Sequence, residues 1–236
     1  MKVALVDERI SQGARRALEI RGFRVVDMPK SRYLGGAVSS HPDMLVMKLG
    51  DSLITTADYI EEASYVFSDI RELTDVSIRV TDESCSPKYP SDAILNCLDF
   101  NDILFAKCDT ASKYVLEYAK SLGRKIVNTK QGYPACSVLA FGGKYAVTAD
   151  KGLAQTMRSE GIEVLEIDNG GISLPPYEYG FIGGASGVYD KTVYFIGDVD
   201  THPSAKEIRA FIEGRGFSVV SLGSGMLADL GKIIFI

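Results

Sequence analysis

The feature that most constrains the fold of this chain is an internal repeat. An apolar run, a two-residue turn, a second apolar run, an amphipathic helix and a short β-rich run recur about five times in 236 residues. The turns are Gly50-Asp51, Asn101-Asp102, Gly143-Lys144, Asp190-Lys191 and Gly231-Lys232. Such pairs tolerate the positive φ that two-residue β-hairpins require. The repeat therefore predicts ββαβ units, with the strands inside and the helices outside.

The fifth unit is divided between the two ends of the sequence. Its apolar pair, MLADL-GK-IIFI, stops at Ile236 without a helix, and the missing helix and last strand stand near the start as ERISQGARRALEIRG and FRVVDMP. A repeat split in this way predicts a closed arrangement in which the N- and C-terminal segments pair. Residues 2–6 and 232–236 both fit the second strand of this unit, so one strand is left over.

Four segments have helical spacing and end at glycine: residues 12–21, 110–123, 151–161 and 202–216. Glycine supplies the left-handed residue that ends a helix. Asp150 and Asp198 precede helices and are expected to cap them, and a weaker helix begins near Ala57. Residues 29–40, 82–91 and 169–186 are expected to form loops. Together these elements indicate a single α/β domain over residues 1–236.

Composition excludes several classes of function. The chain is 46% hydrophobic, carries a net charge of -5 and has no Lys/Arg cluster longer than two residues, which argues against nucleic-acid binding. No segment approaches the roughly 20 apolar residues of a membrane span, and the first apolar run is too short for a signal peptide. We expect a cytoplasmic protein. Its four cysteines, Cys85, Cys97, Cys108 and Cys136, form no CxxC motif and are interpreted as free thiols, with no zinc site and no cofactor.

Two long segments resemble a known fold family. The stretch CSVLAFGGKYAVTADKGLAQTMRSEGIEVLEI and the later GFIGGASGVY are similar in order and spacing to the guanidino-group-modifying enzymes, also called penteins. That group includes arginine and agmatine deiminases, dimethylarginine hydrolase and the non-catalytic ribosome anti-association factor. The motifs SSHPD, GYPACS and YEYGFIGGASG more closely resemble an uncharacterised bacterial family of this fold. The resemblance implies a five-bladed α/β propeller around a pseudo-fivefold axis.

The catalytic residues of the family are absent from their matching positions. Active members carry a cysteine at the end of the glycine-rich loop, where this chain has Gly183-Gly184-Ala185-Ser186-Gly187. The family's His-x-Asp would fall at Pro90-Ser91-Asp92, which lacks the histidine. A His-x-Asp does occur one unit earlier, as His41-Pro42-Asp43. The resemblance therefore implies the fold more strongly than it implies an activity.

In a propeller the starts of the inner strands converge on one axis, which gathers polar residues from every unit. The candidates there are His41, Asp43, Ser91, Asp92, Cys136, Ser137, Ser186 and Ser224. In one interpretation Cys136 is a nucleophile, His41 transfers the proton, and Asp43 and Asp92 bind a cationic substrate. In the other, Cys136 packs as a small buried hydrophobe and His41 caps a turn.

The ligand-binding candidates are Asp43, Asp92, Ser137, Gly183, Gly184 and Ser186. The glycines in this set let the backbone approach a ligand or another strand closely. We expect Tyr177, Tyr179 and Phe181 at a pocket rim. His202 is expected at the surface of a helix start, with Asp200 or Thr201 as its N-cap; Cys85 is expected to be exposed, and Cys97 and Cys108 buried.

The sequence thus predicts a cavity for a small polar or cationic ligand, of guanidino or amino-acid type. One alternative is a divergent cysteine-dependent amidinohydrolase or deiminase, acting on C–N bonds through Cys136 and His41. Another is a non-catalytic protein-interaction module, as in the ribosome-binding member of the fold. A homodimer is compatible with the sequence, which does not specify the oligomeric state.

Overall fold

The computed structural model describes residues 1–236 and contains five three-stranded sheets of one design. In each sheet the middle strand pairs antiparallel with the first strand and parallel with the third. Four sheets are continuous in sequence: β3 (Val46–Leu49), β4 (Ser52–Thr56) and β5 (Ser77–Thr81); β6 (Leu98–Phe100), β7 (Ile103–Ala106) and β8 (Lys125–Asn128); β9 (Val138–Phe141), β10 (Tyr145–Thr148) and β11 (Glu163–Glu166); β13 (Ser186–Tyr189), β14 (Thr192–Phe195) and β15 (Ser218–Ser221).

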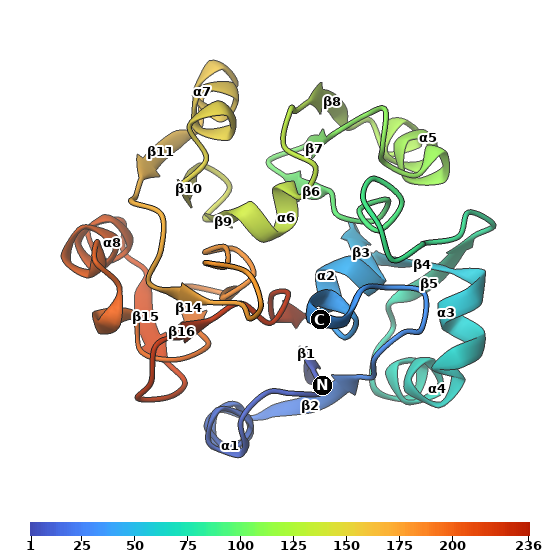
Figure 1. The fold of residues 1–236 in the computed structure, drawn as a ribbon, viewed down its shortest axis with the longest axis horizontal. Helices are drawn as coiled ribbons and strands as arrows, with labels where there is room; N and C mark the ends of the chain where they lie inside the picture. Colours follow the sequence, from blue (N-terminus) through green and yellow to red (C-terminus); the bar gives the residue numbers. More distant parts are fainter.

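The fifth sheet joins the two ends of the sequence. It consists of β17 (Ile234–Phe235), β1 (Lys2–Asp7) and β2 (Phe23–Met28), with β17 antiparallel to β1. Residues 2–7 are therefore the second strand of this unit, which resolves the strand left over in the sequence pattern. Both termini lie near the middle of the molecule (Figure 1).

The predicted hairpin MLADL-GK-IIFI is wrong. Its first half contributes β16 (Leu227–Ala228), which pairs parallel with β12 (Ile172–Ser173) in a separate two-stranded sheet. Gly231 and Lys232 do have positive φ, but the N–H of Lys232 donates to the carbonyl of Gly184 at 2.8 Å instead of closing a hairpin. The preference of these two residues for a positive φ is a local property. It does not determine which strands the flanking residues pair with.

A helix connects the second and third strands of each unit, and the longer helices lie at the periphery of the molecule (Figure 1). The α-helices are α1 (Gln12–Ile20), α2 (Pro42–Leu45), α3 (Ala57–Glu62), α4 (Ser64–Leu73), α5 (Lys113–Ser121), α6 (Pro134–Ser137), α7 (Lys151–Ser159) and α8 (Ala205–Glu213), and the 3-10 turns are η1 (Gly36–Val38) and η2 (Val199–Thr201). None of these helices combines the length and hydrophobicity needed to cross a membrane.

Helix boundaries follow from their capping residues. The Asp150 carboxylate accepts the N–H of Leu153 at 2.8 Å at the start of α7, and Gly161 follows the helix with φ +80°. Asp198 caps η2 in the same way. Both predicted caps are confirmed, because a side-chain oxygen satisfies an N–H that the helix cannot.

Three hairpin turns have the predicted two residues, and a fourth is longer. Asn101 and Asp102 have φ of 55° and 59° between β6 and β7. Phe141 pairs with Tyr145, so the turn predicted as Gly143-Lys144 includes Gly142 as well. Gly142 and Gly143 both have positive φ there, and a Cβ at Gly142 would lie 2.9 Å from the phenyl ring of Phe217.

Some burial predictions are corrected by the structure. His202 is 3% exposed, and its Nδ1 accepts the N–H of Ser204, which is the N-cap of α8. Cys85 is buried rather than exposed, and Cys108 is only half-buried. The polar sequence around Cys85 suggested exposure, but the loop folds inward over the largest core cluster, which includes its side chain.

Candidate functional site

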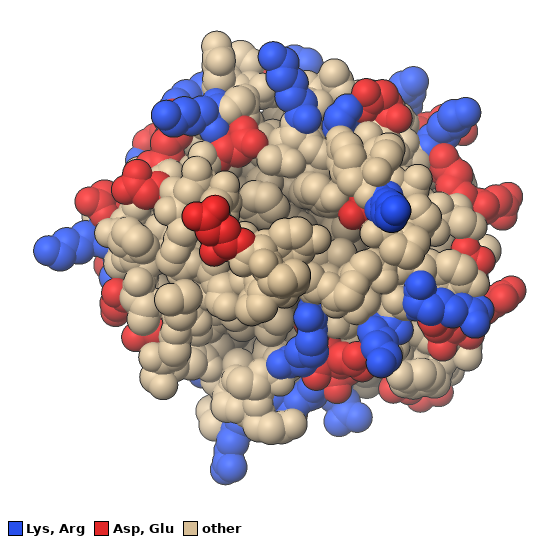
Figure 2. Space-filling view, in the orientation of Figure 1, with Lys and Arg blue, Asp and Glu red and all other residues tan.

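A cavity of about 340 Å³ lies where the segments preceding the first strands meet. Figure 2 shows this face of the molecule hollowed near its middle, with Lys and Arg side chains mostly toward its edge. The lining contains carboxylates and aromatic rings but no Lys or Arg: Val38, His41, Met44, Asp92, Tyr133, Cys136, Leu174, Tyr177, Glu178, Tyr179, Phe181 and Asp229.

The lining residues occupy equivalent positions in the repeated units. The fifth residue before the first strand is His41, Ala93, Tyr133, Phe181 or Asp229, counted back from β3, β6, β9, β13 and β17. Four of these five line the cavity, and in the remaining unit the adjacent residue, Asp92, does so. The same backbone path before each first strand thus carries one side chain per unit into a common space.

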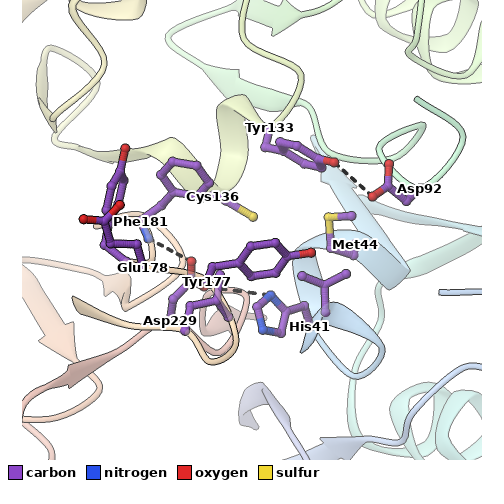
Figure 3. A pocket seen from close by; sticks show the side chains of 12 residues that line it. His41, Met44, Asp92, Tyr133, Cys136, Tyr177, Glu178, Phe181 and Asp229 are labelled. Atoms are coloured by element: carbon purple, nitrogen blue, oxygen red, sulfur yellow. Dashed lines mark hydrogen bonds and ion pairs between the residues drawn. The ribbon is translucent and has the colours of Figure 1, made fainter. Parts of the chain in front are cut away.

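Cys136 lies at the floor of the cavity, where Figure 3 shows its sulfur among the lining side chains. It also belongs to a buried polar cluster. Its Sγ donates to Asp43 Oδ2 at 2.9 Å, and Asn96 Nδ2 donates to the same sulfur at 3.1 Å. Asn96 Oδ1 in turn accepts the backbone N–H of Ala135 at 3.0 Å. Asn96 therefore holds the turn that carries Cys136 against the turn that carries Asp43.

The environment of this cluster favours uncharged groups. Burial, together with the carboxylates of Asp43 and Asp229, raises the pKa of the Cys136 thiol well above its usual value. Burial also raises the pKa of Asp43 to about 6, although the hydrogen bond from Cys136 opposes the shift. Cys136 is therefore a thiol rather than a thiolate at neutral pH.

His41 is fully buried between two carboxylates. Its Nδ1 lies 3.8 Å from Asp229 Oδ1, and its Nε2 lies 4.0 Å from Asp7 Oδ2, so neither nitrogen is hydrogen-bonded. Burial lowers the pKa of His41 to about 4, and the imidazole is neutral at pH 7. Figure 3 shows the ring beside Asp229, on the side of the cavity facing Cys136.

Asp229 and Asp92 are the two aspartates that line the cavity. Asp229 accepts the backbone N–H groups of Phe181 at 2.9 Å and Gly231 at 3.1 Å, and burial raises its pKa to about 7. The Asp92 Oδ2 accepts the hydroxyl of Tyr133 at 2.9 Å, whereas its Oδ1 has no partner. Burial raises the pKa of Asp92 as well.

His41, Asp92 and Cys136 line the cavity, and Asp43 contacts Cys136 from outside it. The other candidates lie outside the cavity. Ser137 faces a neighbouring cavity, and the hydroxyl of Ser186 donates to the carbonyl of Ile182 at 2.8 Å. A Cβ at Gly183 would lie 2.5 Å from the carbonyl oxygen of Cys136, and the N–H of Gly184 donates to that same oxygen at 2.8 Å. These glycines let two backbone segments pass closely.

Residues at the site that were not predicted include Asp7, Asn96, Tyr133 and Asp229. Asp229 was missed because residues 226–230 were assigned to a strand. With the first strand at residues 234–235, the repeat spacing places Asp229 at the position of His41. Asn96 lies within the apolar run DAILNCLDF, which predicts a strand, so nothing in the pattern marked Asn96 as a site residue.

Comparison with protein families gives one match. The model described as "Family of unknown function (DUF6873)" matches residues 5–234. The chain belongs to this DUF6873 family. A comparison with curated proteins found no match.

Solved structures similar to this DUF6873 protein include a dimethylarginine dimethylaminohydrolase and an amidinotransferase. An adduct of dimethylarginine dimethylaminohydrolase with 4-chloro-2-hydroxymethylpyridine has a TM-score of 0.58 and 11% identity, covering 94% of this chain and 92% of the other. DDAH from Pseudomonas aeruginosa, a cysteine-to-serine mutant complexed with citrulline, gives 0.58 and 10%, covering 94% and 91%. SxtG, an amidinotransferase from Microseira wollei, gives 0.57 and 8%, covering 94% and 77%. These values show a shared pentein fold.

Proposed function

We propose that this protein binds a small organic cation, of guanidino or amino-acid type, in the cavity lined by Asp92 and Asp229. The observation that carries the proposal is the charge of the lining, which has three carboxylates and no Lys or Arg. Glu178 supplies the third carboxylate from the loop at the rim. A cation in this space is attracted by each of these carboxylates in its ionised form.

The shape and chemistry of the walls favour a planar head group. The rings of Tyr133, Tyr177 and Phe181 line the cavity, and the faces of aromatic rings attract cations in a desolvated site. The unpartnered Oδ1 of Asp92 supplies an acceptor for an N–H donor. In this proposal residues 1–236 act as one domain, and the five sheets form a propeller closed by the pairing of β1 with β17.

Calorimetric titration tests the proposal with arginine and agmatine as cations and citrulline as a matched neutral compound. We expect the cations to bind and citrulline to bind at least ~10-fold more weakly, because a charged hydrogen bond contributes about 1.5–3 kcal/mol. Asp92→Asn should weaken cation binding by a similar factor. Asp190→Asn removes the same charge at an exposed turn where asparagine is favoured.

The proposal fails if neither cation binds, or if citrulline binds as tightly as arginine. It also fails if Asp190→Asn weakens binding as much as Asp92→Asn, because the effect would then arise from net charge. Circular dichroism of each variant separates loss of binding from loss of folding.

The position of Cys136 supports a second candidate, a cysteine-dependent amidinohydrolase. The thiol and His41 both line the cavity, and a bound cation would oppose the effect of Asp43 and Asp229 on the thiol pKa. In this scheme the sulfur attacks the amidino carbon, and His41 takes the thiol proton and gives it to the leaving amine. Water then releases the product and restores the thiol.

A cationic haloacetamidine probe tests this second candidate. It should alkylate Cys136 in preference to the half-buried Cys108, and Cys136→Ser should abolish both this labelling and any release of amine from arginine derivatives. Equal labelling of the two thiols, or turnover that survives Cys136→Ser, would exclude Cys136 as the nucleophile.

A further inference from the structure

Three metal-ligating side chains of different types meet at the floor of the cavity. One ligand atom each from His41, Asp43 and Cys136 lie within 4.8 Å of one another, and all three residues are buried. In a tetrahedral Zn²⁺ site with bonds of about 2.0–2.3 Å, ligand atoms lie roughly 3.5 Å apart. A contraction of at most about 1.3 Å in any ligand–ligand distance would therefore bring these atoms to bonding distance of one ion.

A second observation points to a missing partner at this place. Neither nitrogen of His41 has a hydrogen-bond partner, although the side chain is 0% exposed, and Asp43 Oδ1 is likewise buried and unpartnered. Each such group costs about 1–3 kcal/mol when left unsatisfied. A metal ion would satisfy the imidazole and the carboxylate together.

The surroundings supply the outer hydrogen bonds that metal sites require. Asp229 lies beside Nδ1 of His41 and Asp7 beside Nε2, so whichever nitrogen binds a metal leaves the other facing a carboxylate. Asn96 Nδ2 already donates to the Cys136 sulfur at 3.1 Å, a contact that stabilises a thiolate. Such partners orient the ligands and tune the affinity of metal sites.

We propose that His41, Asp43 and Cys136 bind a divalent transition metal of the Zn²⁺ type, with an open coordination position facing the cavity. Thiolate, imidazole and carboxylate together are typical ligands of Zn²⁺. As the sulfur–metal bond forms, the thiol proton leaves to solvent, so the two anionic ligands balance the charge of the ion. The inference goes beyond organic-cation binding, because Asp92 and Glu178 remain free in the loaded site.

One cation near these ligands is Arg9, which is paired with Asp7, and the other is Lys232. Its Nζ donates to the carbonyl of Ala135 at 3.2 Å, and its charge stabilises the ionised form of Asp43. It therefore competes electrostatically with a metal ion. Replacing it with methionine, of similar length, should tighten metal binding.

Titration of chelator-treated protein with Co²⁺ tests the proposal, because a cobalt–thiolate bond produces a charge-transfer absorption band. We expect one Co²⁺ per chain, the band to be present, and Zn²⁺ to displace Co²⁺. Cys136→Ser should abolish the band, and His41→Asn should weaken binding about 100-fold or more, at least as much as loss of an outer partner does. Lys232→Met should bind more tightly than the unmodified protein.

The chain contains matched controls for both ligands. Cys108→Ser removes a thiol, and His202→Asn removes the other histidine, at positions outside the cluster. Both controls should leave the band and the affinity unchanged. Absence of a thiolate band in folded protein, or a band that depends on Cys108 instead of Cys136, would overturn the proposal. Arginine binding measured on Cys136→Ser keeps this result separate from the proposed organic-cation site.

Discussion

At the scale of single residues, burial decides the charge states at the centre of this protein. Asp43 and Asp229 have raised pKa values and His41 has a lowered one, with burial as the largest cause each time. Hydrogen bonds from N–H groups oppose the shift at Asp229 but do not cancel it. These shifts favour the uncharged forms of the buried carboxyl groups and of the imidazole. A bound cation or metal ion would favour ionisation of the carboxyl groups.

Asp229 should make the metal-free protein less stable as the pH rises from 6 to 8. Its pKa is about 7 in the folded protein and about 3.9 when unfolded, so the folded state binds more protons in between. Stability therefore falls with increasing pH, by about 1.4 kcal/mol between pH 6 and 8. His41 has the opposite effect, because its pKa is about 4 in the folded protein and about 6.5 when unfolded. It offsets about 0.8 kcal/mol of this fall between pH 6 and 8.

Urea unfolding in the presence of a chelator measures this slope. In Asp229→Asn the group no longer titrates, so the decline from pH 6 to 8 should be smaller by about 1.4 kcal/mol, whatever the variant's stability at pH 6. An equally steep decline in both proteins would show that another group is responsible.

The four thiols should react in the order of their exposure. Burial raises the pKa of Cys85 and of Cys97 to about 12, and that of Cys136 is also well above normal. Cys108 is only half-buried. Neutral iodoacetamide at pH 8 should therefore modify Cys108 first, as followed by mass spectrometry of peptides, and Cys108→Ser should remove the fast phase. Faster labelling of Cys136 by this uncharged reagent would contradict the charge state assigned to its thiol.

At the scale of elements, local signals predicted what is local. Helix ends at glycine and turns such as Asn101-Asp102 were predictable because the residue itself prefers the required φ. The position of β16 was not, because its partner β12 is far away in the sequence. His202 was misjudged for the same reason: its own neighbours are polar, whereas the burial comes from tertiary packing.

Gly183 lies where two backbone segments leave no room for a side chain. A Cβ there would lie within 2.6 Å of three backbone carbonyl oxygens of α6 and β9. Backbone cannot move aside as a flexible side chain can, so Gly183→Ala should cost at least about 2 kcal/mol in free energy of unfolding. Gly36→Ala has no atom within 4 Å of its new Cβ and an ordinary φ, and should be near neutral. Equal stabilities by urea denaturation would show that the two segments are not in contact.

At the scale of the whole molecule, the repeat predicted that one unit is shared between the two ends, and β17 does pair with β1. The convergence of His41, Asp43, Asp92 and Cys136 was predictable because equivalent positions of repeated units approach one centre. The partners that set their chemistry, such as Asn96 and Asp229, were not. Asn96 lies inside an apolar run, and Asp229 lies in a segment that was wrongly assigned to a strand. Both residues acquire their roles only through contacts between units.

The split unit leads to a test of the whole architecture by circular permutation. β17 and β1 are related as β13 and β14 are, except that no turn joins them. Linking Ile236 to Met1 through Asn-Gly and opening the chain at Asp190-Lys191 would move the break by one unit and keep every sheet. The permutant should unfold in one cooperative transition, followed by circular dichroism, with a melting temperature within several degrees of that of the parent.

A second permutant opened inside β4, between Leu53 and Ile54, interrupts a fully buried strand and should not fold. If neither permutant folds, the pairing of β1 with β17 does not close the molecule. If both permutants fold, the stability of the molecule does not depend on keeping each strand intact.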